Sequence, residues 1–212
     1  MNLTIAKYAL QEPNWPRSGR HIMAHYDGSS VIVYQAYNPS IGRFAAQNGY
    51  FGGDFRYTRM SWCKPNFLWM MYRSDWGTKE GQEVTLAISL KRAFFDALLE
   101  QAVPSAFDNA THLDKAAWTA AVAASEARLQ WDPDHDPAGA PTARRAIQLG
   151  MRGAVLQEYG REAILEIQDI SDFVAAQRCN LNAPSFPDLL TPAERVYKPA
   201  NSSITTKLRL SE

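Results

Sequence analysis

Residues 59–79, RMSWCKPNFLWMMYRSDWGTK, hold three of the six tryptophans of the chain together with four cations. Large aromatic rings are normally core residues, whereas Lys and Arg are rarely buried without partners. One segment accommodates both if its rings pack inward and its cations face a cleft. This stretch therefore predicts one wall of a site for a phosphate-bearing ligand. Its candidate substrate-binding residues are Arg59, Ser61, Trp62, Lys64, Trp69, Arg73 and Lys79.

Polar residues that interrupt other apolar segments extend this candidate site, because a few hydrogen-bonding groups on rigid elements are typical of ligand pockets. Arg59, Lys64, Arg73 and Arg145 are expected to converge on one concave surface. The alternative is that the rings are core and the cations pair with nearby carboxylates. The further candidate substrate-binding residues are Tyr34, Gln35, Asn38, Gln130, Arg145 and Gln148.

Catalytic carboxylates are predicted at Glu83 and Asp132, where a negative charge can stabilise positive charge that develops on a ribose. Other chemistries have weaker support. Asp132, Asp134 and Asp136 resemble a site for a hard metal or a solvated acidic loop, and no metal is assigned. Cys63 beside a lysine is a nucleophile or, as we favour, a small buried side chain. The sequence holds no P-loop, no HExxH and no G-x-S-x-G motif.

Composition limits the possible partners. The chain has 212 residues, 46% of them hydrophobic, and a formal net charge of zero, so no global field attracts it to nucleic acid or membrane. Only two cysteines are present, which is too few for a disulfide framework. No apolar run reaches the length of a signal peptide or a membrane span. We expect a cytoplasmic protein that does not bind membranes.

Helical and strand-like patterns interleave without a regular βαβ rhythm, which indicates one α+β domain with a mixed or antiparallel sheet flanked by helices. We expect an irregular arm at 1–19, this domain at 20–179 and a proline-bearing extended tail at 180–212. Strands are predicted at 31–37, 83–90, 129–132, 146–149 and 163–167, with a loop over 132–141. Helices are predicted at 38–48, 67–72, 91–103, 115–128, 154–159 and 171–178.

Four segments together resemble the domain of unknown function family 4291, known from bacteria and fungi. They are VYQAYNPSIG at 33–42, the stretch at 59–79 continued by GQEVTLAI at 81–88, QWDPDHDP at 130–137, and RRAIQLGMRG at 144–153. The family usually has Ile or a similar residue where this chain has Cys63, which argues against a nucleophilic thiol. The resemblance implies a soluble single-domain protein and supplies no reaction.

A second resemblance concerns fold. A strand that ends in Tyr and a polar residue, then a helix that closes on glycine, then a further aromatic and polar segment is similar to the start of the ADP-ribosyltransferase fold, which binds NAD. Gln35 stands where that superfamily commonly has His or Arg. No catalytic glutamate is identified among Glu83, Asp132 and Glu166. The likeness is one of fold, and it carries little weight for function.

These patterns lead to three functional hypotheses. The first is an enzyme that acts on a nucleotide or other phosphorylated substrate, in its most concrete form an NAD-using ADP-ribosyl transferase. The second is a non-catalytic protein that binds single-stranded nucleic acid or nucleotides through the same rings and cations. The third is metal-dependent hydrolysis through the aspartates of 132–136.

Overall fold

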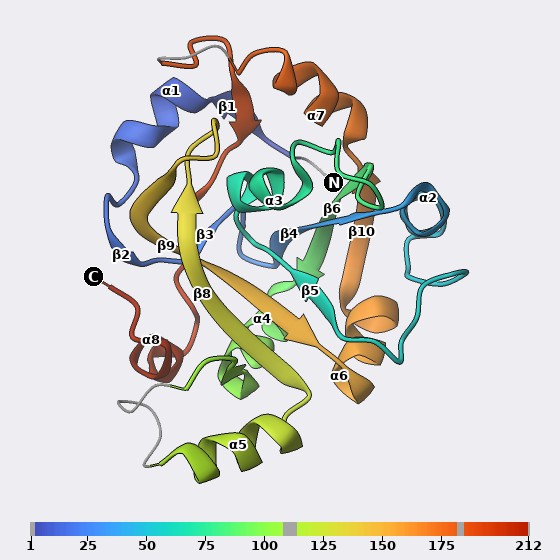
Figure 1. Ribbon diagram of the computed structural model, residues 1–212, viewed down its shortest axis with the longest axis vertical. Helices are drawn as coiled ribbons and strands as arrows, with labels where there is room; N and C mark the ends of the chain where they lie inside the picture. The colour runs from blue at the N-terminus through green and yellow to red at the C-terminus, as the bar shows by residue number, and fades with distance from the viewer. Residues whose placement is uncertain (1–2, 108–113, 182–184, 212) are drawn as a thin grey trace.

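Two β-sheets form the centre of the computed structural model, which describes residues 3–107, 114–181 and 185–211 (Figure 1). One sheet is antiparallel with the order β10-β6-β4, and the other is mixed with the order β2-β9-β8-β7 and with β5 paired to β9. A backbone bridge between Tyr34 and Lys64 connects them. The larger strands are β4 Ser30–Tyr37, β5 Ser61–Cys63, β6 Val84–Lys91, β8 Ala127–His135, β9 Pro141–Met151 and β10 Ile164–Asp169; the short ones are β2 Gly19–Arg20 and β7 Val103–Pro104.

The fold is therefore a single α+β domain, as predicted, although the strands of the described residues are divided among four sheets, two large and two of only two strands, instead of forming one. The helices include α2 Pro39–Asn48, α3 Phe67–Ser74, α4 Arg92–Gln101, α5 Lys115–Ala124, α6 Gly153–Glu158 with a π-helical continuation Tyr159–Ala163, and α7 Ser171–Arg178. Among the described residues, every helix is too short or too polar to cross a membrane.

Helix α2 begins and ends at the residues that the sequence predicts. The Asn38 side chain accepts a hydrogen bond from the backbone N–H of Ile41 at 3.0 Å, and Gly49 ends the helix with φ of 76°. Helix α3 follows the same logic, because the Asn66 side chain accepts from the backbone N–H of Trp69 at 2.7 Å. Local capping signals thus fix both helices beside the sheets.

The β8–β9 hairpin corrects the expectation of two short strands with a loop over 132–141. Both strands are longer, and the turn is confined to the few residues after His135, where the Asp136 backbone N–H donates to the Ala140 carbonyl at 2.9 Å. A register shift between Pro133 and His135 accommodates the proline. The acidic residues do not mark a solvated loop, because Asp134 is buried in an ion pair with Arg144. The same extension of β8 ends α5 at Ala124, before the expected residue 128.

The two ends of the described chain pair with each other. β1 Ile5–Lys7 is antiparallel to β11 Leu190–Pro192, and β12 Arg195–Val196 is antiparallel to β3 Met23–Ala24. The arm expected to be irregular therefore contains β1, α1 Tyr8–Gln11 and a 3-10 turn, and the tail expected to be extended contains β11, β12 and α8 Ser202–Leu208. β1 has its backbone partner in the tail, and β12 has its partner in β3, far away along the chain, so a local sequence pattern does not show these strands.

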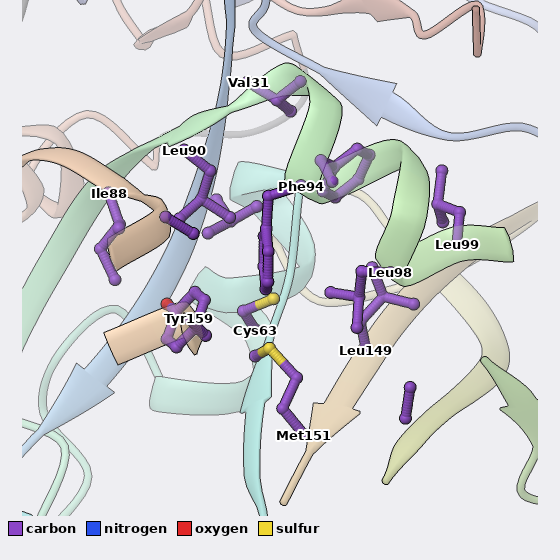
Figure 2. Packing of buried hydrophobic residues seen from close by; sticks show 14 of the residues in the cluster. Val31, Cys63, Ile88, Leu90, Phe94, Leu98, Leu99, Leu149, Met151 and Tyr159 are labelled. Carbon is purple, nitrogen blue, oxygen red and sulfur yellow. The ribbon is translucent and has the colours of Figure 1, made fainter. Parts of the chain in front are cut away.

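The main hydrophobic core lies where both sheets pack against α4 and α6 (Figure 2). Cys63 points into it among Phe94, Leu149 and Met151. Burial raises the pKa of the Cys63 thiol to about 12, so the thiol stays protonated at neutral pH and is not an activated nucleophile. The favoured interpretation of Cys63 as a small buried side chain matches this position.

Candidate functional site

The polar face of the β5, β9 and β8 strands and the adjacent helix α3 line a pocket of about 400 Å³, here called the β8–β9 pocket. All of its lining residues belong to the set predicted from the sequence. They are Trp62, Lys64, Trp69, Arg73, Gln130, Asp132 and Gln148.

Strand alternation explains why these side chains share one face. Gln130 and Asp132 are two residues apart on β8, and Gln148 lies directly opposite Gln130 on β9. Trp62 and Lys64 are likewise two residues apart, and Trp62 lies opposite Gly150. The residues between them, such as Cys63, turn to the core. The sheet therefore presents an apolar face to the core and a polar face to the pocket.

Lys64 is the most unusual residue of the pocket, because its side chain is almost fully buried with 6% exposed. Its backbone is fixed by two hydrogen bonds with Tyr34, of 2.7 Å and 3.1 Å. Within the described parts of the chain, no hydrogen bond or ion pair joins its amine to another residue. Burial lowers the pKa of Lys64 to about 8, with Arg73 lowering it further and Asp132 opposing the shift.

Asp132 is held in one orientation by the two glutamines of the pocket. Gln130 Nε2 donates to one carboxylate oxygen at 2.7 Å, and Gln148 Nε2 donates to the other at 2.9 Å. The carboxylate is half-buried. Its oxygens keep lone pairs for a further donor, since each carboxylate oxygen accepts about two hydrogen bonds.

Two tryptophans form the aromatic walls. Trp69 is 4% exposed and stacks on Tyr72 and on His135, with ring centroids 5.4 Å and 5.2 Å away. Its indole Nε1 has no hydrogen-bond partner among the residues that the structure describes. Trp62 is half-buried, and its ring lies against Gly150 of β9.

Gly150 is a site residue that the sequence analysis missed. A Cβ at this position would lie 2.9 Å from the Trp62 ring, so only glycine leaves room for the ring. The available signal was a glycine inside a strand pattern, which often marks a close approach.

The expected convergence of four cations holds for two of them. Lys64 and Arg73 share the β8–β9 pocket, whereas Arg145 lines a cavity of about 260 Å³ and donates to the Trp131 carbonyl at 2.7 Å. Arg145 and Gln148 are three residues apart on a strand, so their side chains leave it on opposite faces. Arg59 lines a cavity of about 900 Å³ beside the start of α2, together with Asn38 and Ser61.

The remaining predicted residues lie outside the β8–β9 pocket. Lys79 lines a neighbouring cavity of about 390 Å³ to which Arg73 also contributes. Glu83 is exposed and accepts a hydrogen bond from the backbone N–H of Gly81 at 2.7 Å. Tyr34 is fully buried in a second hydrophobic cluster around α3.

The polar atoms of the Gln35 side chain are all used in hydrogen bonds within the protein. Its Nε2 donates to Ser61 Oγ at 2.9 Å and to the Trp62 carbonyl at 3.0 Å, and its Oε1 accepts from the Tyr159 hydroxyl at 2.6 Å. The side chain is only 2% exposed. It therefore ties β4 to β5 and to the π-helical turn after α6.

The aspartates of 132–136 point to different partners. Asp132 contacts the two glutamines, Asp134 forms the buried ion pair with Arg144, and Asp136 caps the hairpin turn. Across the described residues, no three His, Cys, Asp or Glu side chains are grouped as metal ligands. This separation removes the geometric support for metal-dependent hydrolysis at the aspartates.

Comparison with known proteins identifies the family of the chain. No curated protein matches the chain. A family model described as "Domain of unknown function (DUF4291)" matches residues 21–197, which is most of the length of the chain. The match includes every residue of the β8–β9 pocket. The chain belongs to the DUF4291 family.

Proposed function

We propose that the protein is an enzyme that binds a nucleotide-like or phosphorylated small molecule in the β8–β9 pocket. The observation that carries this proposal is the meeting of two cations, two indole rings and one oriented carboxylate in a single pocket. A concave site of a few hundred Å³ with a few fixed polar groups is typical of small-molecule binding.

The position of each side chain supports a role in binding. Arg73 is exposed at the rim, where its guanidinium can form paired hydrogen bonds with a phosphate. The half-buried Trp62 ring offers a face on which a base or nicotinamide can stack. The amine of Lys64 is a donor for the part of the substrate that enters the pocket.

The most concrete version of the proposal is NAD-using ADP-ribosyl transfer. In this version Asp132, and not Glu83, stabilises the positive charge that develops on the ribose when nicotinamide leaves. Asp132 is favoured because it is held in the pocket while Glu83 lies outside it. We place this activity in the cytoplasm, which is consistent with two free cysteines.

Calorimetry and thermal shift with NAD, ATP and ribose 5-phosphate test the proposal. We expect Arg73→Gln to weaken binding at least about tenfold, the effect of losing one charge-assisted contact of about 1.5–3 kcal/mol. Lys79→Gln is the matched control, since it removes the same charge from the same segment outside the β8–β9 pocket and should leave affinity unchanged. If none of these ligands stabilises the protein, the proposal is wrong.

The chemical step is tested by nicotinamide release from NAD. Asp132→Asn keeps the size of the side chain and removes its charge, so it should lower the rate about 100-fold or more while NAD still binds. Unchanged release by this variant would exclude Asp132 from the reaction.

Binding of single-stranded nucleic acid is the alternative. It is favoured by the exposed ring of Tyr72, which lies beside Arg73 and Lys79 in the neighbouring cavity. This alternative requires that affinity for oligonucleotides falls steeply between 50 mM and 200 mM salt, which fluorescence anisotropy measures. Affinity that does not depend on salt would count against it.

A further inference from the structure

Among the described residues, the amine of Lys64 forms no ion pair and no hydrogen bond, and the carboxylate that shares its pocket is that of Asp132. A lysine that is 94% buried normally has an ion-pair partner, because removing an ammonium from water is costly. Here the backbone of Lys64 is fixed by Tyr34 and its neighbour Arg73 adds a second positive charge. The protein thus maintains an amine at the pocket without neutralising it.

Such an environment favours the unprotonated amine. Desolvation by burial and a nearby cation are two conditions that activate lysine as a nucleophile toward carbonyl carbon. The Trp62 and Trp69 rings supply the apolar wall, Arg73 supplies the cation, and the lowered pKa of Lys64 agrees with both. A purely structural lysine needs none of these features.

We infer that Lys64 is a nucleophile that forms an imine with the aldehyde or ketone group of a phosphorylated substrate, such as the open-chain form of a sugar phosphate. The phosphate in this inference rests on the proposed function, in which Arg73 binds it. The carbonyl chemistry goes beyond that function and depends on Lys64.

The step is balanced without a further reactant. The neutral Nζ attacks the carbonyl carbon, a C–N bond forms, and the carbonyl oxygen takes up the proton that the nitrogen loses. The resulting hydroxyl then takes up the remaining proton of the nitrogen and leaves as water, while the electron pair of that N–H bond forms the C=N bond. Asp132 lines the same pocket with free lone pairs and can carry these protons between nitrogen and oxygen.

Reductive trapping tests the inference on the full chain. The protein is incubated with ribose 5-phosphate and sodium cyanoborohydride, which reduces an imine to a stable amine, and the adduct is located by peptide mass mapping. We expect Lys64 to be modified at least tenfold faster than Lys79, which serves as an internal control on the same segment. Lys64→Arg should abolish the fast adduct, whereas Lys79→Arg should leave it unchanged. Because the rates of Lys64 and Lys79 are compared within the wild-type protein, that part of the test does not depend on whether a variant folds.

The arms of the experiment separate the inference from the proposed function. If ribose 5-phosphate stabilises the protein but Lys64 reacts no faster than Lys79, the imine is excluded and the proposed binding stands. If Lys64 reacts equally fast with ribose and with ribose 5-phosphate, and Arg73→Gln changes neither rate, the imine stands and the phosphate site is wrong. The inference predicts preferential trapping of ribose 5-phosphate and an approximately tenfold loss of that preference in Arg73→Gln. The absence of both adduct and stabilisation would overturn both.

Discussion

Lys64 and Arg144 are both buried cations, with 6% and 7% of the residue exposed, yet their surroundings differ completely. Arg144 donates to Asp134 at 2.7 Å and to the Pro16 carbonyl at 2.9 Å, and its guanidinium lies 5.2 Å from the centre of the Trp15 ring. Lys64 has no equivalent partner within the described chain. The comparison shows that burial alone does not identify a structural charge; what decides is whether the protein itself satisfies it.

The largest effect should follow from removing the satisfied cation. Arg144→Met leaves Asp134, which is fully buried, without its counter-ion, and breaking such a pair costs about 3–5 kcal/mol. Urea denaturation at pH 7 measures the loss in the free energy of unfolding. Arg144→Met combined with Asp134→Leu should recover more than half of it. If Arg144→Met lowers the free energy of unfolding by less than about 1 kcal/mol, Arg144 is not a stabilising cation and the contrast with Lys64 is wrong.

Glu194 is a buried acidic residue, and its effect on stability can be compared with that of the two buried cations. Burial raises the pKa of Glu194 to about 8, so between pH 4.5 and 8 the folded protein retains a proton that the unfolded chain has released. The stability of the wild type therefore falls as pH rises through this window. Relative to Glu194→Gln, which cannot ionise, we expect the wild type to lose about 2–4 kcal/mol between pH 5 and pH 9. Parallel stability curves for the two proteins would show that Glu194 is not protonated when folded.

The substitution Lys64→Met should raise the free energy of unfolding, whereas Arg144→Met should lower it. The variant removes a buried charge that lacks a partner, so it should be more stable than the wild type by about 1–3 kcal/mol at pH 7. The folded pKa of about 8 lies below the ordinary value of 10.5, so the unfolded wild type binds more protons between these pH values. The wild type consequently gains stability there, and the difference from Lys64→Met should shrink by pH 10. Ligand affinity should fall in the same variant; destabilisation at pH 7 would assign Lys64 a structural role.

The smallest effect concerns Asn38, a predicted binding residue whose side chain caps α2. Asn38→Ala should cost about 1 kcal/mol of stability, while Asn38→Asp retains the cap and should cost less. Neither change should alter ligand affinity in the β8–β9 pocket, which calorimetry measures. A loss of affinity in Asn38→Asp, with stability unchanged, would move Asn38 into the binding site.

Local signals predicted the elements whose ends are set by their own residues. Helix α2 was predicted because Asn38 and Gly49 act at the ends of the helix itself. Strand β4 was predicted from its β-branched and aromatic run, and β6 from the alternation of its larger apolar residues. The β8–β9 hairpin was predicted too short because the residue that neutralises Asp134 lies ten positions away on the other strand. The sequence around residues 132–137 shows the carboxylates and the prolines, but it does not show that Asp134 pairs with Arg144.

Residue types anticipated the composition of the pocket better than its boundary. Trp62, Lys64 and Asp132 stand out because polar and aromatic residues break apolar patterns, and strand alternation then places them together. Arg145 was included because of its charge, although its odd spacing from Gln148 places it on the other face. Gly150 was missed because its contribution is the space above it, which becomes visible only when β5 is placed beside β9.

The pairing of β1 with β11 has a consequence for how the protein folds during synthesis. Gln11 donates to Thr191, 180 residues further along the chain, and the Trp15 indole donates to the Glu194 carbonyl. A ribosome releases the first of these segments long before it makes the second. Contacts of such sequence separation form late, because loop closure must precede them. Until residues 190–196 emerge, Trp15 and the unpaired edge of β1 remain open to chaperones and to other chains, so the nascent protein is most prone to aggregation just before its last strands appear.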